Sequence, residues 1–236
     1  MHGASRLTDL DLALDITGDW ASRALLRIVH AGLRLNGLRL RVVCQEQTVH
    51  GIQQLATSLV EPLYFSQNRL SVLDLDVSRS QLDVSTGHFL INAVRRMSHL
   101  TRLSLNLSHN PTIGNFSLFR GTNVQDGDAL LVHLTVKLNH CAMGRYGFRQ
   151  WMSNLGDAGL WPNQLQTLSF HCTDNHIGDG VGEGPIPFPM EHPSATHLLI
   201  DVRNNGTTPQ GLCNWITDAK SNHPNVHLLL QTGTTK

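Results

Sequence analysis

Leucines recur along this chain in a fixed pattern. Apolar residues occupy the first, fourth and sixth positions of a short motif, L-x-x-L-x-L, whose copies follow one another at intervals of 28 to 35 residues. The middle apolar residues of the eight copies are Leu10, Leu38, Leu73, Leu103, Leu134, Leu168, Leu198 and Leu228. Internal repetition at such an even spacing is typical of a chain built from repeated structural units.

Each copy of the motif alternates apolar and polar residues, as in the segment 73–77, which reads L-D-L-D-V. Alternation with a period of two predicts a β-strand that buries one face. The pattern therefore predicts about eight strands, one in each unit. The leucines that we expect to be almost fully buried are Leu73, Leu75, Leu103, Leu105, Leu134 and Leu168.

Several segments between the copies have the apolar spacing of amphipathic helices. One begins at Asp19, and a second covers residues 49–59. The third is opened by Ser85, with Phe89, Ala93, Val94 and Met97 inward, and the fourth buries Phe148, Trp151, Met152 and Leu155. Thr208 followed by Pro209 is a start signal for a fifth. Segments 108–130 and 174–195 have no helical pattern.

Units of about thirty residues cannot bury their apolar faces alone, so they must stack on one another. The L-x-x-L-x-L copies followed by helices resemble the leucine-rich-repeat family, and most closely its longer, ribonuclease-inhibitor-like type. The resemblance covers nearly the whole chain. It implies an α/β solenoid formed by one domain, 1–236, with an open, curved parallel sheet of about eight strands. Helices or loops would lie on its convex side.

The chain departs from this family at the turn after the motif. The family has Asn or Cys three residues after the last leucine, where these residues form a row of turns. Here those positions hold Asp15, Val43, Ser78, Ser108, Asn139, Thr173 and Arg203. Because only Asn139 matches, the sequence predicts a degenerate row of turn residues.

Eight strand–helix units are also compatible with a closed (β/α)8 barrel, which would favour an enzyme of the hydrolase or isomerase type. Barrel strands are buried on both faces and should read as continuous apolar runs. These strands instead place polar residues such as Asp74, Lys137 and His171 on their second face. The open sheet is therefore the preferred prediction, and the barrel is the alternative.

If the strands are in register, the polar residues of the second face form rows across the sheet. The candidate partner-binding residues in these rows are Arg39, Arg41, Asp74, Asp76, Asn106, Lys137, His171 and Asp201. The register also predicts ion pairs that join Asp11, Arg39 and Asp74, and another between Arg41 and Asp76. A solvated face that neutralises its own charges is the alternative interpretation.

Two clusters of potential metal ligands are present. The register makes His197 and His227 neighbours, with His171 nearby, and adjacent imidazoles can bind a metal or respond to pH. Alternation turns Cys172 inward, opposite to His171, so a core thiol is the better interpretation. We expect no bound metal or cofactor. The Gly- and Pro-rich insertion at 174–195 would replace a helix or bind a partner.

Composition narrows the class of partner. The chain has 18 Lys and Arg residues and 18 Asp and Glu residues, so no net field attracts it to nucleic acid or to a membrane. The four cysteines form no CxxC pair, and no secretory signal is visible, which predicts a reduced, cytoplasmic protein.

No catalytic motif such as G-x-S-x-G or H-E-x-x-H is present, so we expect no enzyme. The sequence predicts a non-catalytic protein–protein interaction or scaffold module, or a subunit of a larger assembly. It would bind another protein through the concave sheet face or through its C-terminal edge strand. That last strand, 226–231, has no acidic residue, Lys or Arg to discourage edge pairing.

Overall fold

The protein is described by a computed structural model. It describes residues 9–16, 36–44, 70–95, 97, 99–114, 130–156, 165–178, 196–211, 213–214, 217 and 227–233. The predicted helices after Asp19 and at 49–59, and most of the insertion at 174–195, lie outside these residues.

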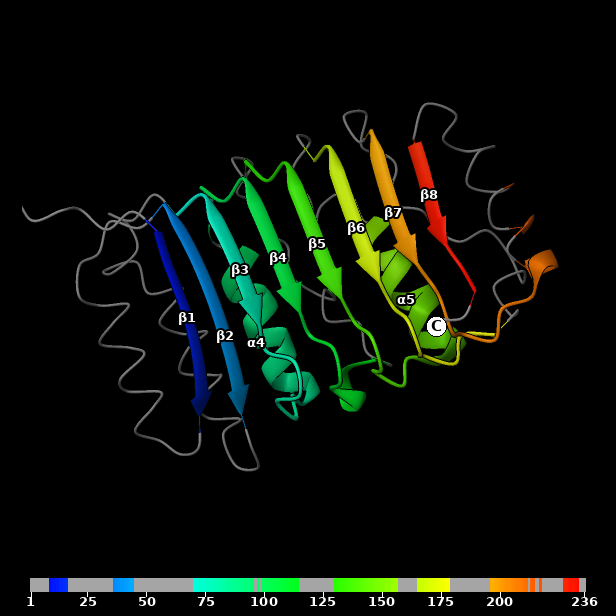
Figure 1. The fold of residues 1–236 in the computed structure, drawn as a ribbon, viewed down its shortest axis with the longest axis horizontal. Coiled ribbons are helices and arrows are strands. Elements are labelled where there is room, and N and C mark those ends of the chain that lie inside the picture. Colours follow the sequence, from blue (N-terminus) through cyan, green and yellow to red (C-terminus); the bar gives the residue numbers. More distant parts are fainter. Residues whose placement is uncertain are drawn as a thin grey trace, which may run out of the picture.

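Eight parallel strands form one sheet (Figure 1). They are β1 (Asp9–Ile16), β2 (Gly37–Cys44), β3 (Val72–Asp76), β4 (Arg102–Asn106), β5 (His133–Lys137), β6 (Thr167–His171), β7 (His197–Asp201) and β8 (His227–Gln231). Their order in the sheet is their order in the sequence, so β1 and β8 lie at opposite ends. The predicted open parallel sheet is confirmed, and the closed barrel is wrong.

The repeated leucines set the register of this sheet. The middle apolar residue of each motif pairs with that of the next, from Leu10 with Leu38 at one end to Leu198 with Leu228 at the other. A slip by one residue would turn every buried side chain outward, so the shared pattern specifies this register strongly. Equivalent side chains therefore form rows that cross the strands.

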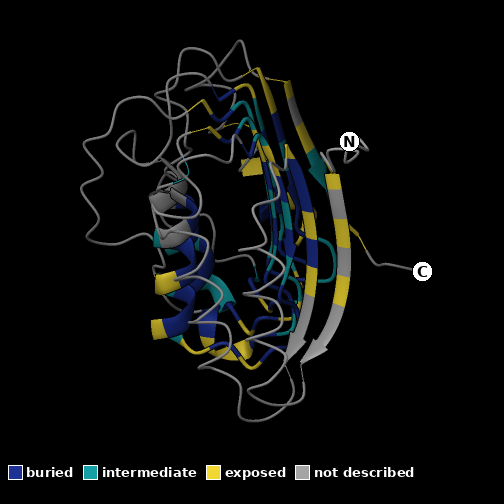
Figure 2. Cartoon of the chain, turned by 90° about the vertical axis from the view of Figure 1, so that its left-hand side faces the viewer, coloured by how far each residue is buried: buried dark blue, intermediate teal, exposed yellow. Residues whose placement is uncertain are grey.

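The buried face of the sheet is the core of the protein. The six leucines predicted to be buried are 0% to 4% exposed, which confirms the alternation. The two described α-helices, α4 (Val84–Arg95) and α5 (Gly144–Gly156), both cover this face (Figure 2). The opposite face carries no helix in the part of the chain that the structure describes. We call it the free face.

Helix α4 begins at a different cap from the predicted one. Asp83, and not Ser85, accepts a hydrogen bond through Oδ1 from the backbone N–H of Thr86, at 2.7 Å. Hydrogen bonds from Thr86 hold the pKa of Asp83 below its ordinary value. The buried side chains are Leu90, Ile91 and Val94, whereas Phe89 is 48% exposed. The prediction that Phe89 points inward is wrong, because Phe89 lies about 100° around the helix from Leu90.

Helix α5 buries the aromatic residues that its sequence predicted. Phe148, Trp151 and Met152 are fully buried, and the side chain of Leu155 lies outside the described residues. The rings of Phe148 and Trp151 contact Phe170 of β6, with centroids 6.1 and 6.2 Å apart. This aromatic contact fixes α5 against the sheet.

After β7, the chain turns into helical residues at 209–211, 213–214 and 217. Their start is as predicted, since the Thr208 hydroxyl accepts a hydrogen bond from the backbone N–H of Gly211 at 3.3 Å. No helix in the described residues is long and apolar enough to cross a membrane.

A continuous row of turn residues follows the strands, and this finding overturns the prediction of a degenerate one. Its members are Ser80, Asn110, Cys141, Asn175 and Asn205, and we call this row the turn ladder. Each lies five residues after the last apolar residue of its motif, not three. One more buried residue, such as Leu107 or Leu138, follows the end of the strand before the turn begins.

Each asparagine of the turn ladder joins two units. Oδ1 of Asn110 accepts hydrogen bonds from the backbone N–H groups of Ser80 and Leu82, at 3.1 and 3.0 Å. Its Nδ2 donates to the carbonyls of Val77 and Leu107, at 3.1 and 2.8 Å. The side chain is fully buried, so these bonds satisfy backbone groups that water does not reach.

The same arrangement is repeated at Asn175 and Asn205. Asn175 accepts from the backbone N–H of Cys141 at 2.8 Å, and Asn205 accepts from that of Asn175 at 2.7 Å. The backbone conformation of the turn is repeated as well. The residue just before each member of the ladder has a positive φ, as at His109, His140 and Asp174. The turn ladder thus holds the carboxyl ends of neighbouring strands in line.

Gly114 shows how tightly successive turns approach. A Cβ atom at this position would lie 2.0 Å from the carbonyl oxygen of Cys141 and 2.8 Å from the backbone of Met143. Both obstacles are backbone atoms, which cannot rotate away. Glycine is therefore required here by the close approach of two units and not by its own φ of −64°.

Candidate functional site

Three rows of side chains cross the free face at right angles to the strands. The first row is Asp9, Gly37, Val72, Arg102, His133, Thr167, His197 and His227. The second row is Asp11, Arg39, Asp74, Ser104, Thr135, Ser169, Leu199 and Leu229. The third row is Ala13, Arg41, Asp76, Asn106, Lys137, His171, Asp201 and Gln231. All eight predicted partner-binding residues belong to the second and third rows.

Strands β1 to β3 carry charges that are paired with one another. Arg39 lies between two carboxylates, with Nη1 at 3.4 Å from Oδ2 of Asp11 and Nε at 3.1 Å from Oδ2 of Asp74. Arg41 Nε lies 3.8 Å from Oδ2 of Asp76. These are the ion pairs that the sequence predicted. They are solvent-exposed, so they stabilise the sheet little, but they leave this end of the face without free cations.

Asp201 is held inside the molecule. Its side chain is 2% exposed, and its two carboxylate oxygens accept hydrogen bonds from Nε and Nη2 of Arg203, at 2.8 and 2.6 Å. Burial alone would raise the pKa of Asp201, but the hydrogen bonds from Arg203 outweigh it and lower that pKa. Asp201 therefore anchors Arg203 and cannot itself contact a partner.

His171 lies beside this pair, with Nδ1 at 3.5 Å from Oδ2 of Asp201. Burial lowers the pKa of His171 although Asp201 opposes the shift. The imidazole is therefore mainly neutral at neutral pH. It extends the buried network around Asp201 to the surface of the third row.

The middle of the free face, on β4 to β6, has a different chemistry. Arg102 and Lys137 are its cations, and no residue of the free face on these three strands is acidic. Between them, in the second row, lie the half-buried hydroxyls of Ser104, Thr135 and Ser169. The side chain of Asn106 stabilises the turn that follows β4, because its Oδ1 accepts a hydrogen bond from the backbone N–H of Ser108 at 3.2 Å.

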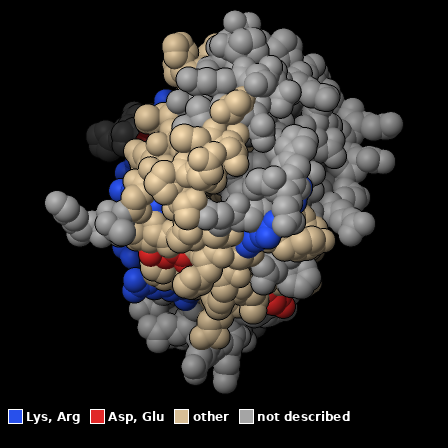
Figure 3. Space-filling model, turned by 90° about the vertical axis from the view of Figure 1, so that its right-hand side faces the viewer, with Lys and Arg blue, Asp and Glu red and all other residues tan. Residues whose placement is uncertain are grey.

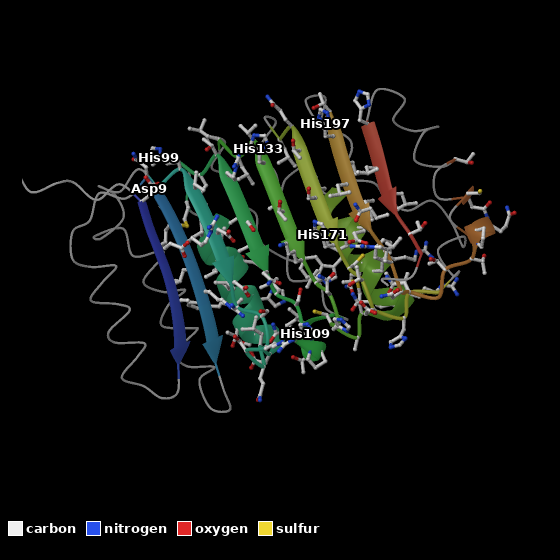
Figure 4. All side chains as sticks on the ribbon, in the orientation of Figure 1. Asp9, His99, His109, His133, His171 and His197 are labelled. Carbon is white, nitrogen blue, oxygen red and sulfur yellow. The ribbon has the colours of Figure 1, made fainter. Side chains whose placement is uncertain are left out.

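The β7 and β8 end of the face is apolar in the second row. Leu199 is half-buried, and Leu229 is 58% exposed. In the first row the rings of His197 and His227 stack with centroids 5.4 Å apart, as neighbours in the predicted register. His171 lies in the third row and faces Asp201, so the three histidines do not converge (Figure 4). The described residues include no group of three or more potential ligands that could hold a metal.

The structure also reveals a histidine pair that the sequence analysis missed. His109 and His140 follow β4 and β5, and their rings stack with centroids 4.5 Å apart and an angle of 14° between planes. Nε2 of His140 lies 3.4 Å from Oδ2 of Asp174, the equivalent residue of the next unit. Burial, followed by the neighbouring His140, lowers the pKa of His109. Both histidines lie four residues after the last apolar residue of their motif, and this equivalent position is the sequence signal that could have identified the pair.

The two buried cysteines are poor nucleophiles. Cys141 and Cys172 are buried free thiols, and burial raises the pKa of Cys141 to about 11 and that of Cys172 well above its ordinary value. Sγ of Cys172 donates to the carbonyl of Asp201 at 3.3 Å, in keeping with the predicted core thiol. A thiol reacts as the thiolate, so neither cysteine is set up for covalent catalysis.

Seen from the side of β8, Lys and Arg side chains line the edge formed by the free face, and other charged side chains lie away from it (Figure 3). No protein-family model matches this chain, and no curated protein matches it either. The chemistry of the free face is therefore the main indication of function.

Proposed function

We propose that this chain is a non-catalytic module of the leucine-rich-repeat type that binds another protein through the free face. The observation that carries the proposal is the free face itself. All eight strands contribute registered side chains to it, and no described helix covers it. A broad surface to which many units contribute suits an extended protein partner, whereas small ligands are usually held in concave pockets.

Two features support the leucine-rich-repeat part of the proposal. Each unit supplies one strand to a sheet whose order follows the sequence. The side chains of Asn110, Cys141, Asn175 and Asn205 in the turn ladder then bond to the backbone of a neighbouring unit. These are the contacts that allow units to stack when none of them can bury its own core.

The non-catalytic part of the proposal is supported by the state of the reactive groups. The pKa of the buried thiols Cys141 and Cys172 is raised, and His171 is tied to Asp201. The hydrolase or isomerase alternative depended on a closed barrel, and the sheet is open. Free thiols at Cys141 and Cys172 are in keeping with the reduced, cytoplasmic location that we propose.

Affinity capture from an extract of the native cells, with paired variants as bait, tests the proposal. The free-face variant combines Ser104→Glu and Ser169→Glu, which place two acidic side chains on the second row. The matched control combines Tyr146→Glu and Gln150→Glu on α5, where Tyr146 is 74% exposed. Both variants add two glutamates, but only the first changes the free face.

We expect mass spectrometry to find a protein that the wild-type chain and the α5 variant capture equally and that the free-face variant loses. If the free-face variant retains a partner that the α5 variant loses, the binding surface lies on the helices and not on the free face. Equal capture by all three baits would contradict a role for the free face.

A further inference from the structure

Some cations of the free face form an ion pair with a carboxylate, and others do not. Arg39, Arg41 and Arg203 all form ion pairs with aspartates of the same face. The side chains of Arg102 and Lys137, on β4 and β5, form no ion pair or hydrogen bond with any residue in the described ranges. Positive charge is therefore left unmatched only in the middle of this face, as far as the described residues show.

Hydroxyl groups occupy the second row, which lies between the rows of these two cations. Ser104, Thr135 and Ser169 are register neighbours in the second row, and their hydroxyls make no hydrogen bond within the described part of the chain. Each can donate to an anionic oxygen. We call Arg102, Ser104, Thr135, Lys137 and Ser169 the central patch. It offers hydrogen-bond donors and positive charge, and none of its members is acidic.

The spacing within the central patch selects the shape of its ligand. Arg102 pairs with His133, and Lys137 lies four residues further along β5. At a rise of about 3.3 Å per residue, the two cations are separated by about 13 Å along the strand direction. Arg and Lys side chains are long enough to lean towards one small anion, but an extended peptide contacts both without such bending, because about four of its residues cover the same distance.

The charge of the rest of the molecule argues against a general attraction for polyanions. Lys and Arg together equal Asp and Glu in number, and the neighbouring strands β1 to β3 carry the acidic residues Asp9, Asp11, Asp74 and Asp76 on the same face. A nucleic acid that extended beyond the central patch would meet those carboxylates. A short acidic segment would not.

We propose that the central patch binds an acidic segment of a partner protein in extended conformation. Its carboxylates pair with Arg102 and Lys137, and its intervening residues lie over the hydroxyls of Ser104, Thr135 and Ser169. The inference rests on the proposed function and names the chemistry of the partner. Charge-assisted hydrogen bonds of this kind are the stronger polar contacts in protein interfaces.

Fluorescence anisotropy with the full chain and labelled peptides tests this inference. The first probe is a peptide of alternating Glu and Ser, and the second has Lys in place of every Glu. A single-stranded DNA oligonucleotide is the third. We expect saturable binding of the Glu–Ser peptide that weakens as salt is added, and no binding of the Lys–Ser peptide.

Charge-reversal variants locate the binding. We expect Arg102→Glu and Lys137→Glu each to weaken binding of the Glu–Ser peptide about tenfold, with Lys137→Gln intermediate. Arg149→Glu makes the same change in net charge on α5, on the other side of the sheet, and should keep the affinity within about twofold. Melting temperatures should be similar in all four variants, because neither Arg102 nor Lys137 has an ionic partner to lose among the described residues.

Three results would overturn the inference. They are an equal loss of binding in Arg149→Glu, no binding of the Glu–Ser peptide by the wild type, and tighter binding of the DNA with the same dependence on Lys137. The proposed function has its own readout. If Lys137→Glu still captures the native partner that the free-face variant loses, the face binds protein but does not recognise acidic segments.

Discussion

At the scale of single residues, the asparagines of the turn ladder carry the most information. A buried side-chain amide must satisfy two donors and an acceptor, and here it does so with backbone groups of two successive units. Such a residue cannot be replaced without leaving several buried groups unpaired. The ladder therefore stabilises each turn and aligns it with its neighbour.

We expect Asn110→Ala to lower the free energy of unfolding by about 3 kcal/mol or more, because buried N–H and C=O groups lose their partners. Asn106→Ala is the control. It removes one hydrogen bond at a half-buried position and should cost about 1 kcal/mol. Urea unfolding of the two variants checks the difference. Similar losses in both would show that the ladder is not a main source of stability.

Cysteine reactivity provides a second test at this scale. The pKa of Cys141 is about 11, so its thiolate stays scarce in the folded protein at pH values where an exposed thiol, with a pKa of about 8.5, ionises. We expect iodoacetamide to modify the exposed Cys213 between about pH 7 and pH 9 and to spare Cys141 and Cys172. Residue-resolved mass spectrometry measures this.

The same shift affects stability. Folding raises the pKa of Cys141, so its contribution is complete below the unfolded pKa of about 8.5 and is lost as pH rises towards about 11. Rapid modification of Cys141 in the folded protein at about pH 8 would contradict both expectations.

At the scale of elements, the strands could be predicted from the sequence and the turns only in part. Apolar alternation locates all eight strands and their register, because one buried face leaves a strand no freedom to slip. The turn ladder was missed because its position was expected three residues after Leu105 and its equivalents, whereas one more buried residue, such as Leu107, follows the strand before the turn.

The candidate site shows the same division. The register predicted which residues share the free face and which charges pair, as in Arg39 with Asp11 and Asp74. It did not predict the burial of Asp201, because that depends on Arg203, which follows the strand and folds back over it. Sequence alternation assigns a side chain to a face, but what covers it there depends on its neighbours in space.

At the scale of the whole molecule, the two ends of the sheet differ. β1 carries Asp9 and Asp11, whose charges discourage pairing with another strand. β8 pairs only with β7 among the described strands and exposes Leu229. The two edges therefore have unequal tendencies to associate.

We expect the isolated chain to associate reversibly as its concentration rises, because an exposed leucine on an edge strand favours contact with a second edge. Leu229→Lys should abolish the association, and Gln231→Lys, which adds the same charge on the same strand, should weaken it less. Light scattering across a concentration series measures the mass. A wild-type monomer at every concentration would contradict this expectation, and so would equal behaviour of the two variants.

The sequential order of the strands also has a mechanical consequence. Each described strand hydrogen-bonds only to the strands before and after it in the chain. A pulling force applied between β1 and β8 is therefore carried through a series of similar strand interfaces, and no pairing between the described strands bypasses one of them. Such a molecule yields one unit at a time from its ends, and each released unit adds a similar length of extended chain.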